Sequence, residues 1–145
     1  MLFRSHRDFN PSNVYVARTA AGTHLKVLDF GVAKIVGERG AVPRRAATIG
    51  NIRVFSPAYG APEQWTESLG PVGTRADVYA FALLFVEVLA DRAPIEGDHL
   101  GEIADQVLDR ARRPTPRALG VPVDDEVEAV FAAALAVDQI GRAHV

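Results

Sequence analysis

The stretch His6-Arg7-Asp8-Phe9-Asn10-Pro11-Ser12-Asn13 supplies a carboxylate, Asp8, and five residues later an amide, Asn13. Its Asn-Pro-Ser-Asn composition favours irregular backbone over helix or strand. A second stretch, Val27-Leu28-Asp29-Phe30-Gly31, ends an apolar run with another carboxylate, and Gly31 lets the backbone turn sharply. The two stretches therefore predict two neighbouring loops that carry oxygen-bearing side chains.

The segment between these loops has the pattern of a small β hairpin. Residues 14–17 and 24–28 are short strand patterns, and Ala21-Gly22 between them is a turn signal. A hairpin in which Asp8 and Asp29 only cap turns is one interpretation, because Asp often has that role.

Phosphoryl transfer is the other interpretation of these side chains. The reaction needs a base to take the proton of the attacking hydroxyl group and oxygen ligands to hold Mg²⁺ against the phosphates. Asp8 suits the first role, and Asn13 with Asp29 suits the second.

The motifs resemble those of eukaryotic-like, bacterial-type serine/threonine protein kinases, from the catalytic loop onward and over almost the whole chain. The resemblance implies that Asp8 is the catalytic base and that Asn13 and Asp29 bind Mg²⁺ and ATP. His6 and Arg7 would belong to the catalytic-loop motif, and Phe30-Gly31 to the metal-binding motif. Both pairs are expected to have structural or regulatory roles.

The resemblance also assigns residues further along the chain. Ser56 stands where these kinases usually carry threonine in the segment that seats the substrate peptide, and its hydroxyl is expected to bond Asp8. Glu63 of Ala61-Pro62-Glu63 resembles the glutamate that pairs with a buried arginine, which we expect to be missing here. Asp77 is expected to bond the backbone of the catalytic loop.

Residues 30–59 are rich in Gly, Pro and Arg without a sustained period, which predicts a long loop. Thr48 follows Arg44-Arg45 and is a candidate phosphorylation site, whose phosphate Arg7 would receive by family analogy. A solvated arginine pair with no such role is the alternative.

Three helices are expected after this loop. Thr74 is a good N-cap for a helix that is apolar nearly all round over residues 78–89, which predicts burial on all sides. Residues 98–112 have an amphipathic pattern with Ile103, Val107 and Leu108 inward. Residues 124–137 have another, with Val127, Val130, Phe131 and Leu135 in its core stripe. The predicted fold is mainly α with a small β hairpin, like the C-terminal lobe of a kinase, with the N-terminal lobe absent.

Asn10 departs from the family pattern, because kinases carry lysine at this position and use it to contact the γ-phosphate. An asparagine supplies a dipole without a charge, so transition-state stabilisation should fall. A pseudokinase that serves as a scaffold is therefore the main alternative to an active kinase. A small-molecule kinase of the aminoglycoside-phosphotransferase type ranks last, because it would not be expected to carry Glu63 in its motif or the Asp77 helix.

Length and composition agree with part of a soluble kinase domain. The chain has 145 residues and no cysteine. Its formal net charge is −2, so its composition shows no excess of basic residues that would indicate nucleic-acid binding. No apolar run is long enough for a membrane segment. We expect a cytoplasmic domain that uses ATP, Mg²⁺ and a protein substrate.

Both ends of the chain match reading frames of sequencing-adapter DNA. Residues 2–5 are what CTC-TTC-CGA-TCT encodes, and residues 140–145 are what ATC-GGA-AGA-GCA-CAC-GTC encodes. We therefore expect the kinase part at 6–139 and non-native flanks at 1–5 and 140–145. A longer read that continues unchanged through either junction would contradict this interpretation.

Overall fold

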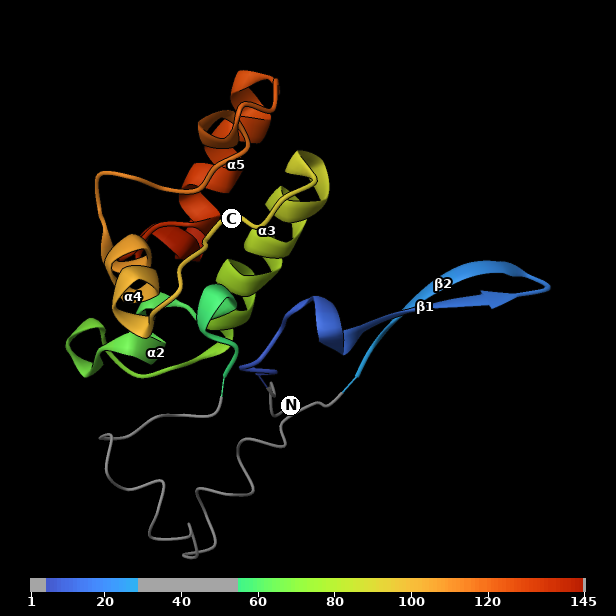
Figure 1. Cartoon of the computed structure of the whole chain (residues 1–145), viewed down its shortest axis with the longest axis horizontal. Helices are drawn as coiled ribbons and strands as arrows, with labels where there is room; N and C mark the ends of the chain where they lie inside the picture. Colours follow the sequence, from blue (N-terminus) through green and yellow to red (C-terminus); the bar gives the residue numbers. More distant parts are fainter. Residues whose placement is uncertain (1–4, 29–54, 145) are drawn as a thin grey trace, which may run out of the picture.

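The computed structural model describes residues 5–28 and 55–144, and Figure 1 shows how they are arranged. These residues are mainly helical with one two-stranded sheet, as expected from the sequence. The strands and α-helices are β1 (Val14–Thr19), β2 (Gly22–Val27), α2 (Pro62–Trp65), α3 (Thr74–Ala90), α4 (Leu100–Leu108) and α5 (Asp125–Ala134). Short 3-10 helices are η1 (Pro11–Asn13), η2 (Pro57–Tyr59), η3 (Glu67–Leu69), η4 (Arg117–Leu119) and η5 (Gly141–His144).

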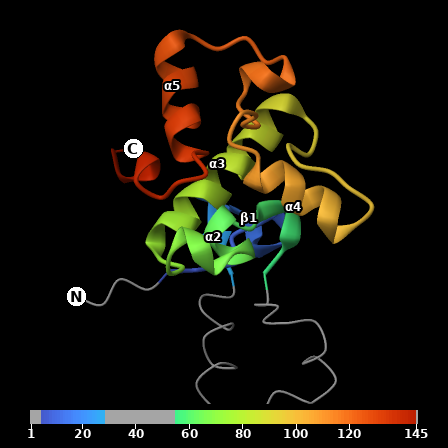
Figure 2. The same ribbon diagram turned by 90° about the vertical axis from the view of Figure 1, so that its left-hand side faces the viewer.

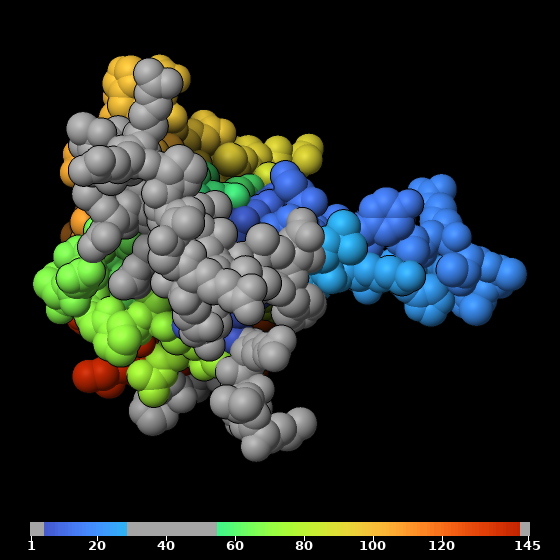
Figure 3. Space-filling view, turned by 90° about the horizontal axis from the view of Figure 1, so that it is seen from below, coloured from blue at the N-terminus to red at the C-terminus, as the bar shows by residue number. Residues whose placement is uncertain are grey.

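The predicted hairpin is present and projects from the helical part (Figures 1 and 3). Strands β1 and β2 pair antiparallel, with Val14 opposite Val27 and Thr19 opposite Gly22. Gly22 has φ 123°, a left-handed conformation that favours glycine at the turn. Most residues of both strands are exposed to solvent, so the hairpin is held mainly through its base.

Helix α3 runs through the middle of the helical part, where it contacts α2, α5, η2 and η5 (Figure 2). Its first helical residue is Thr74, and Gly73 occupies the N-cap position, so the prediction of Thr74 as N-cap is wrong by one residue. Asp77 lies in the first turn, where a negative charge suits the helix dipole. Among the helices of the described ranges, none is long and apolar enough to cross a membrane.

The core forms on one side of α3. Its buried residues come from α3, from the segments beside it and from the end of α5. They are Ala61, Ala76, Tyr79, Ala82, Leu83, Val86, Ile95, Val107, Ala134 and Leu135. This single cluster fixes α3 relative to the helices that follow it.

The opposite side of α3 is open in the part of the chain that the structure describes. Phe81 and Phe85 are 50% and 44% exposed, and Val88 is 72% exposed. The ring of Phe9 lies 5.4 Å from that of Phe81, which lies 4.7 Å from that of Phe85. The prediction of burial on all sides is therefore wrong, because an all-apolar pattern does not show which faces the neighbouring segments cover.

The last two helices are shorter than predicted. Helix α4 begins at Leu100, and α5 begins after Asp124, whose side chain accepts a hydrogen bond from the N–H of Val127 at 2.8 Å. Val127 and Val130 are 37% and 53% exposed, so their predicted inward orientation is wrong. Leu135 of the same predicted stripe is 1% exposed, as expected, and the buried residues of this region lie at the C-terminal end of α5 and just beyond it, at positions 134–137.

Candidate active site

Asp77 holds the backbone of the loop 6–13. Its two carboxylate oxygens accept hydrogen bonds from the backbone N–H groups of His6 and Arg7, each at 2.8 Å. Arg7 has φ 67°, a left-handed conformation that costs a non-glycine residue about 1–2 kcal/mol. Its carbonyl oxygen accepts a further bond from Nε2 of Gln64 at 2.9 Å. Three hydrogen bonds thus stabilise the strained backbone immediately before Asp8.

His6 connects this loop to the end of β2. Its side chain is buried, and Nε2 lies 2.7 Å from the carbonyl oxygen of Leu28. A carbonyl oxygen only accepts, so Nε2 carries the hydrogen in this contact. The N–H of Leu28 donates to the carbonyl oxygen of Asn13 at 2.8 Å. The two ends of the hairpin are therefore joined directly beside Asp8.

The carboxylate of Asp8 is oriented by three donors. Oδ1 accepts from the backbone N–H of Ser56 at 2.7 Å and from Nδ2 of Asn10 at 3.2 Å. Oδ2 receives a longer contact, 3.4 Å, from Nδ2 of Asn13. Asp8 is half-buried, and Oδ2 has no further partner among the described residues.

Asn13 fits a role as a metal ligand. Its Nδ2 donates to the carbonyl oxygen of Asp8 at 2.8 Å, and this fixes the amide group. No residue of the described ranges bonds Oδ1 of Asn13, and an amide oxygen is a ligand that Mg²⁺ accepts. The described residues hold no group of three or more His, Cys, Asp and Glu that could bind a metal. The second predicted ligand, Asp29, lies outside the described residues.

Ser56 meets Asp8 through a different atom than predicted. The expected bond joined the Ser56 hydroxyl to Asp8, but the backbone N–H of Ser56 makes that bond. The hydroxyl oxygen accepts from Nδ2 of Asn10 at 3.0 Å instead. The reason is local: Nδ2 of Asn10 donates both to the Ser56 hydroxyl oxygen and to Oδ1 of Asp8, so the amide lies between the two side chains.

Glu63 has a buried arginine partner, which we expected to be missing. Arg142 donates from Nη1 to Oε1 at 3.1 Å and from Nη2 to Oε2 at 2.6 Å. Both side chains are 0% exposed. Arg142 belongs to the segment 140–145, which was expected to be a non-native flank, and it lies in η5 with its side chain in the core. The expectation of an unpaired Glu63 is therefore wrong.

Three other predicted site residues, Phe30, Gly31 and Thr48, also lie outside the described residues. Their roles remain predictions.

Two contacts of the segment 55–65 were not anticipated. Gln64 uses both ends of its amide: Oε1 accepts from the N–H of Ala61 at 3.0 Å while Nε2 binds the Arg7 carbonyl. The hydroxyl of Tyr59 donates to Oε2 of Glu87 on α3 at 2.5 Å. The signal for Gln64 was its position three residues after Ala61, where a side chain can reach back to the start of a helix.

Tyr59 gives the chain a measurable pH response. Burial, followed by the hydrogen bond and the charge of Glu87, raises the pKa of Tyr59 above its ordinary value of 10.0. A raised folded-state pKa stabilises the protein fully below pH 10, and the stabilisation is lost as the pH rises beyond that value. We expect Tyr59→Phe to lower the free energy of unfolding by about 1–2 kcal/mol near pH 8.

The difference in free energy of unfolding between wild type and Tyr59→Phe should become smaller above pH 10. Urea unfolding at several pH values would measure this difference. Tyr15→Phe is the matched control, because Tyr15 is 58% exposed on the hairpin. An equal difference in free energy of unfolding at pH 8 and pH 11 would contradict a raised pKa of Tyr59 in the folded protein.

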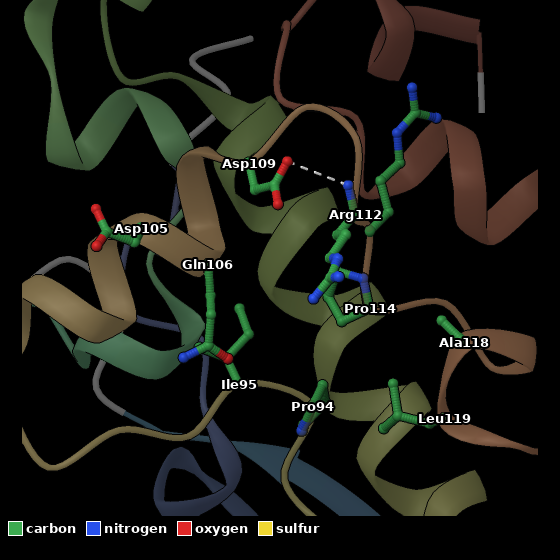
Figure 4. A pocket seen from close by; sticks show the side chains of 10 residues that line it. Pro94, Ile95, Asp105, Gln106, Asp109, Arg112, Pro114, Ala118 and Leu119 are labelled. Atoms are coloured by element: carbon green, nitrogen blue, oxygen red, sulfur yellow. Dashed lines mark hydrogen bonds between the residues drawn. The ribbon is translucent and has the colours of Figure 1, made fainter.

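Two cavities differ in whether residues of the loop 6–13, which carries Asp8, line them. One of about 350 Å³ lies beside α4 and is lined by Ile95, Asp105, Asp109 and their neighbours, without any residue of the loop 6–13 (Figure 4). Another of about 390 Å³ includes Pro11 of that loop, with Glu87 and Asp91 of the α3 region. Only the second borders the loop that carries Asp8.

Comparison with known proteins identifies the family. The sequence profile of the protein kinase domain matches residues 4–139. The chain therefore belongs to the protein kinase domain family, whose members generally use ATP and Mg²⁺.

Its relatives include bacterial serine/threonine protein kinases. The chain is 35% identical over 115 residues to serine/threonine-protein kinase pkn2 of Myxococcus xanthus, with 78% of the chain and 13% of the relative aligned. It is 33% identical over 138 residues to serine/threonine-protein kinase PknB of Mycobacterium leprae, with 94% of the chain and 20% of the relative aligned. The chain is 37% identical over 134 residues to serine/threonine-protein kinase Pkn1 of Myxococcus xanthus, with 90% of the chain and 18% of the relative aligned. The chain thus spans a fifth or less of these relatives.

Proposed function

We propose that residues 6–139 are the C-terminal lobe of a serine/threonine protein kinase that transfers the γ-phosphate of ATP to hydroxyl groups of proteins. The observation that carries this proposal is the arrangement around Asp8. Ser56 and Asn10 bond its Oδ1, while the contact of Oδ2 within the described ranges is that with Asn13 at 3.4 Å. One oxygen is therefore used to hold the carboxylate, and the other is available to a substrate.

Asp8 would act as general base in this reaction. Oδ2 accepts the proton of the substrate hydroxyl as the hydroxyl oxygen bonds to the γ-phosphorus. The bond between that phosphorus and the β–γ bridging oxygen breaks, and ADP leaves with the electron pair. The hydrogen bonds from Ser56 and Asn10 to Oδ1 keep the carboxylate oriented during this step.

Asn13 and Asp29 would hold Mg²⁺. Bound Mg²⁺ supplies positive charge to the phosphate oxygens. Oδ1 of Asn13, which no residue of the described ranges bonds, supports this assignment. The hydrogen bond from Leu28, the residue before Asp29 in the sequence, to the carbonyl oxygen of Asn13 also supports it. Phe30-Gly31 would complete this motif, and phosphorylated Thr48 would pair with Arg7.

A scaffold without activity is the second candidate, and Asn10 favours it. Asn10 carries no charge, and its Nδ2 is bonded to Asp8 and Ser56, so position 10 offers no cation for the γ-phosphate. The sequence of 145 residues also has no glycine-rich phosphate loop followed by a strand lysine. We therefore propose that this chain alone neither binds ATP tightly nor transfers phosphate.

A phosphate-transfer assay with labelled ATP and a generic protein substrate tests the proposal. The full-length protein should transfer label, whereas the 145-residue chain by itself should not. Asn10→Lys in the full-length protein separates the candidates: a large rate gain indicates an impaired kinase, and no rate in either form indicates a scaffold. Activity of the isolated chain, free of contaminating kinase, would contradict the proposal for the chain.

A further inference from the structure

The backbone of Arg7 is held on both sides by side chains from distant parts of the chain. Its N–H donates to Oδ1 of Asp77 at 2.8 Å, and its carbonyl oxygen accepts from Nε2 of Gln64 at 2.9 Å. This carbonyl oxygen belongs to the peptide group that leads into Asp8. Because a peptide group is planar, a bond that fixes the carbonyl oxygen also fixes the direction of the N–H of Asp8.

Arg7 adopts a backbone conformation that depends on such support. Its φ of 67° is left-handed, which brings Cβ close to the backbone and is rare for residues other than glycine. Strain of this kind persists only where the surrounding structure holds the residue, and it is concentrated at functional sites. Relaxation at Arg7 would displace the side chain of Asp8, the next residue.

Gln64 is itself fixed in one orientation. Its Oε1 accepts from the N–H of Ala61 at 3.0 Å, while its Nε2 donates to Arg7. An N–H only donates and a carbonyl oxygen only accepts, so the two partners determine which end of the amide faces which. Glu63, the neighbour of Gln64 on α2, is paired with Arg142 in the core. Gln64 therefore connects a helix anchored in the core to a loop 57 residues away in the sequence.

We propose that Gln64 is a positioning residue for the candidate base. Through the Arg7 carbonyl oxygen it orients the peptide group before Asp8, and so keeps the Asp8 carboxylate in place for the substrate hydroxyl. This inference rests on the proposed function, because it assigns Gln64 to the same reaction. Gln64 does not contact the reacting atoms in this arrangement, since its two polar atoms are bonded to Ala61 and Arg7.

Two substitutions separate this role from simple packing. Gln64→Glu nearly keeps the shape of the side chain, and a carboxylate oxygen can still accept from the N–H of Ala61. The other oxygen then faces the carbonyl oxygen of Arg7, and two acceptors cannot bond each other. Gln64→Met removes both hydrogen bonds and keeps an unbranched side chain that adapts to its surroundings.

The kinetic test measures both variants in the full-length protein. Each should lower kcat for the protein substrate by about 10- to 100-fold, because small misplacement of reacting groups has effects of this size. Gln64→Glu should be at least as impaired as Gln64→Met, although it keeps more of the original shape. The KM for ATP should stay within about twofold of wild type, because neither substitution removes a uniform contact to the nucleotide.

A second measurement, on the 145-residue chain, does not depend on activity. Hydrogen exchange at the N–H of Arg7 should accelerate about 10-fold or more in both variants, because the loop is then held less firmly. The N–H of Leu28, which donates to the carbonyl oxygen of Asn13, is the internal control and should exchange as in wild type. Gln106→Glu is the matched control variant, because Gln106 is an exposed amide on α4 that donates to the carbonyl oxygens of Glu96 and Glu102. It should leave kcat and exchange at Arg7 unchanged.

The outcomes separate this inference from the proposed function. A wild-type protein without transfer activity contradicts the proposed function, while exchange at Arg7 still decides whether Gln64 holds the loop. Three results would overturn the inference and leave the kinase proposal standing: an unchanged kcat in both variants, unchanged exchange at Arg7, or equal acceleration at Arg7 and Leu28. The last result would mean that the substitutions loosen the whole fold rather than the peptide group before Asp8.

Discussion

Arg142→Leu is expected to lower the free energy of unfolding of the 145-residue chain by about 3–5 kcal/mol, because it leaves the Glu63 carboxylate buried without a partner. The substitution removes two hydrogen bonds to Glu63 and two more to the carbonyl oxygens of Arg75 and Val137. It also removes the guanidinium that lies 5.5 Å from the ring centre of Tyr79. Urea unfolding followed by circular dichroism would measure the loss.

The chain contains its own control for this prediction. Arg110 makes a bidentate pair with Asp138, but these side chains are 64% and 52% exposed. Arg110→Leu should therefore cost no more than about 1 kcal/mol, since solvent screens the pair.

The double variant Glu63→Leu/Arg142→Met should recover much of the loss, because a buried ion pair replaced by apolar residues no longer requires desolvation of charge. Equal costs for Arg142→Leu and Arg110→Leu would contradict the assignment of Arg142 as the essential partner of Glu63. The double variant is the sharper test. If Arg142 only filled space in the core, the double variant would regain none of the lost free energy of unfolding.

Local patterns were enough to predict the elements that carry the site. The hairpin follows from strand residues on both sides of Gly22, whose φ of 123° glycine adopts without strain. The loop 6–13 follows from its turn-forming composition, and α3 from an apolar run with Asp77 in its first turn. Each of these signals lies within a few residues of the structure that it predicts. Their contacts with one another, such as that of Asp77 with the loop, were expected only from family resemblance.

Long-range partners were harder to predict. Arg142 lies 79 residues from Glu63, and no local pattern links the two. The hydrogen bond of Ser56 was assigned to its hydroxyl rather than its N–H, because the sequence does not show where the amide of Asn10 lies. Gln64 was missed although it neighbours Glu63, since its partner, the carbonyl oxygen of Arg7, is 57 residues away.

Burial was predicted least well where a pattern was strongly apolar. Phe81 and Val88 of α3 and Val130 of α5 were expected inside and are at least half exposed. Periodicity reports which side chains share a face of a helix, but burial depends on which other segments reach that face. Among the described residues, the exposed face of α3 is contacted by Phe9, whose ring lies against Phe81.

Asp8→Asn in the full-length protein is expected to lower kcat by about 10²- to 10⁴-fold, the contribution of general acid–base catalysis. Asparagine keeps the size of the side chain, and its oxygen can still accept the N–H of Ser56, so the loop should retain its shape. The substitution removes the ability of Oδ2 to take the substrate proton. Rapid-quench measurement of the first turnover would isolate this step from product release.

The matched control for Asp8→Asn is Asp105→Asn, because Asp105 is an exposed carboxylate on α4 that lines the cavity in Figure 4, away from the loop 6–13. It should leave the rate unchanged. A loss of rate in Asp8→Asn accompanied by unchanged unfolding and unchanged ATP affinity identifies a chemical role, since a structural role would alter the free energy of unfolding. If Asp8→Asn transferred phosphate at the wild-type rate, Asp8 would not be the base, and the open Oδ2 would need another explanation.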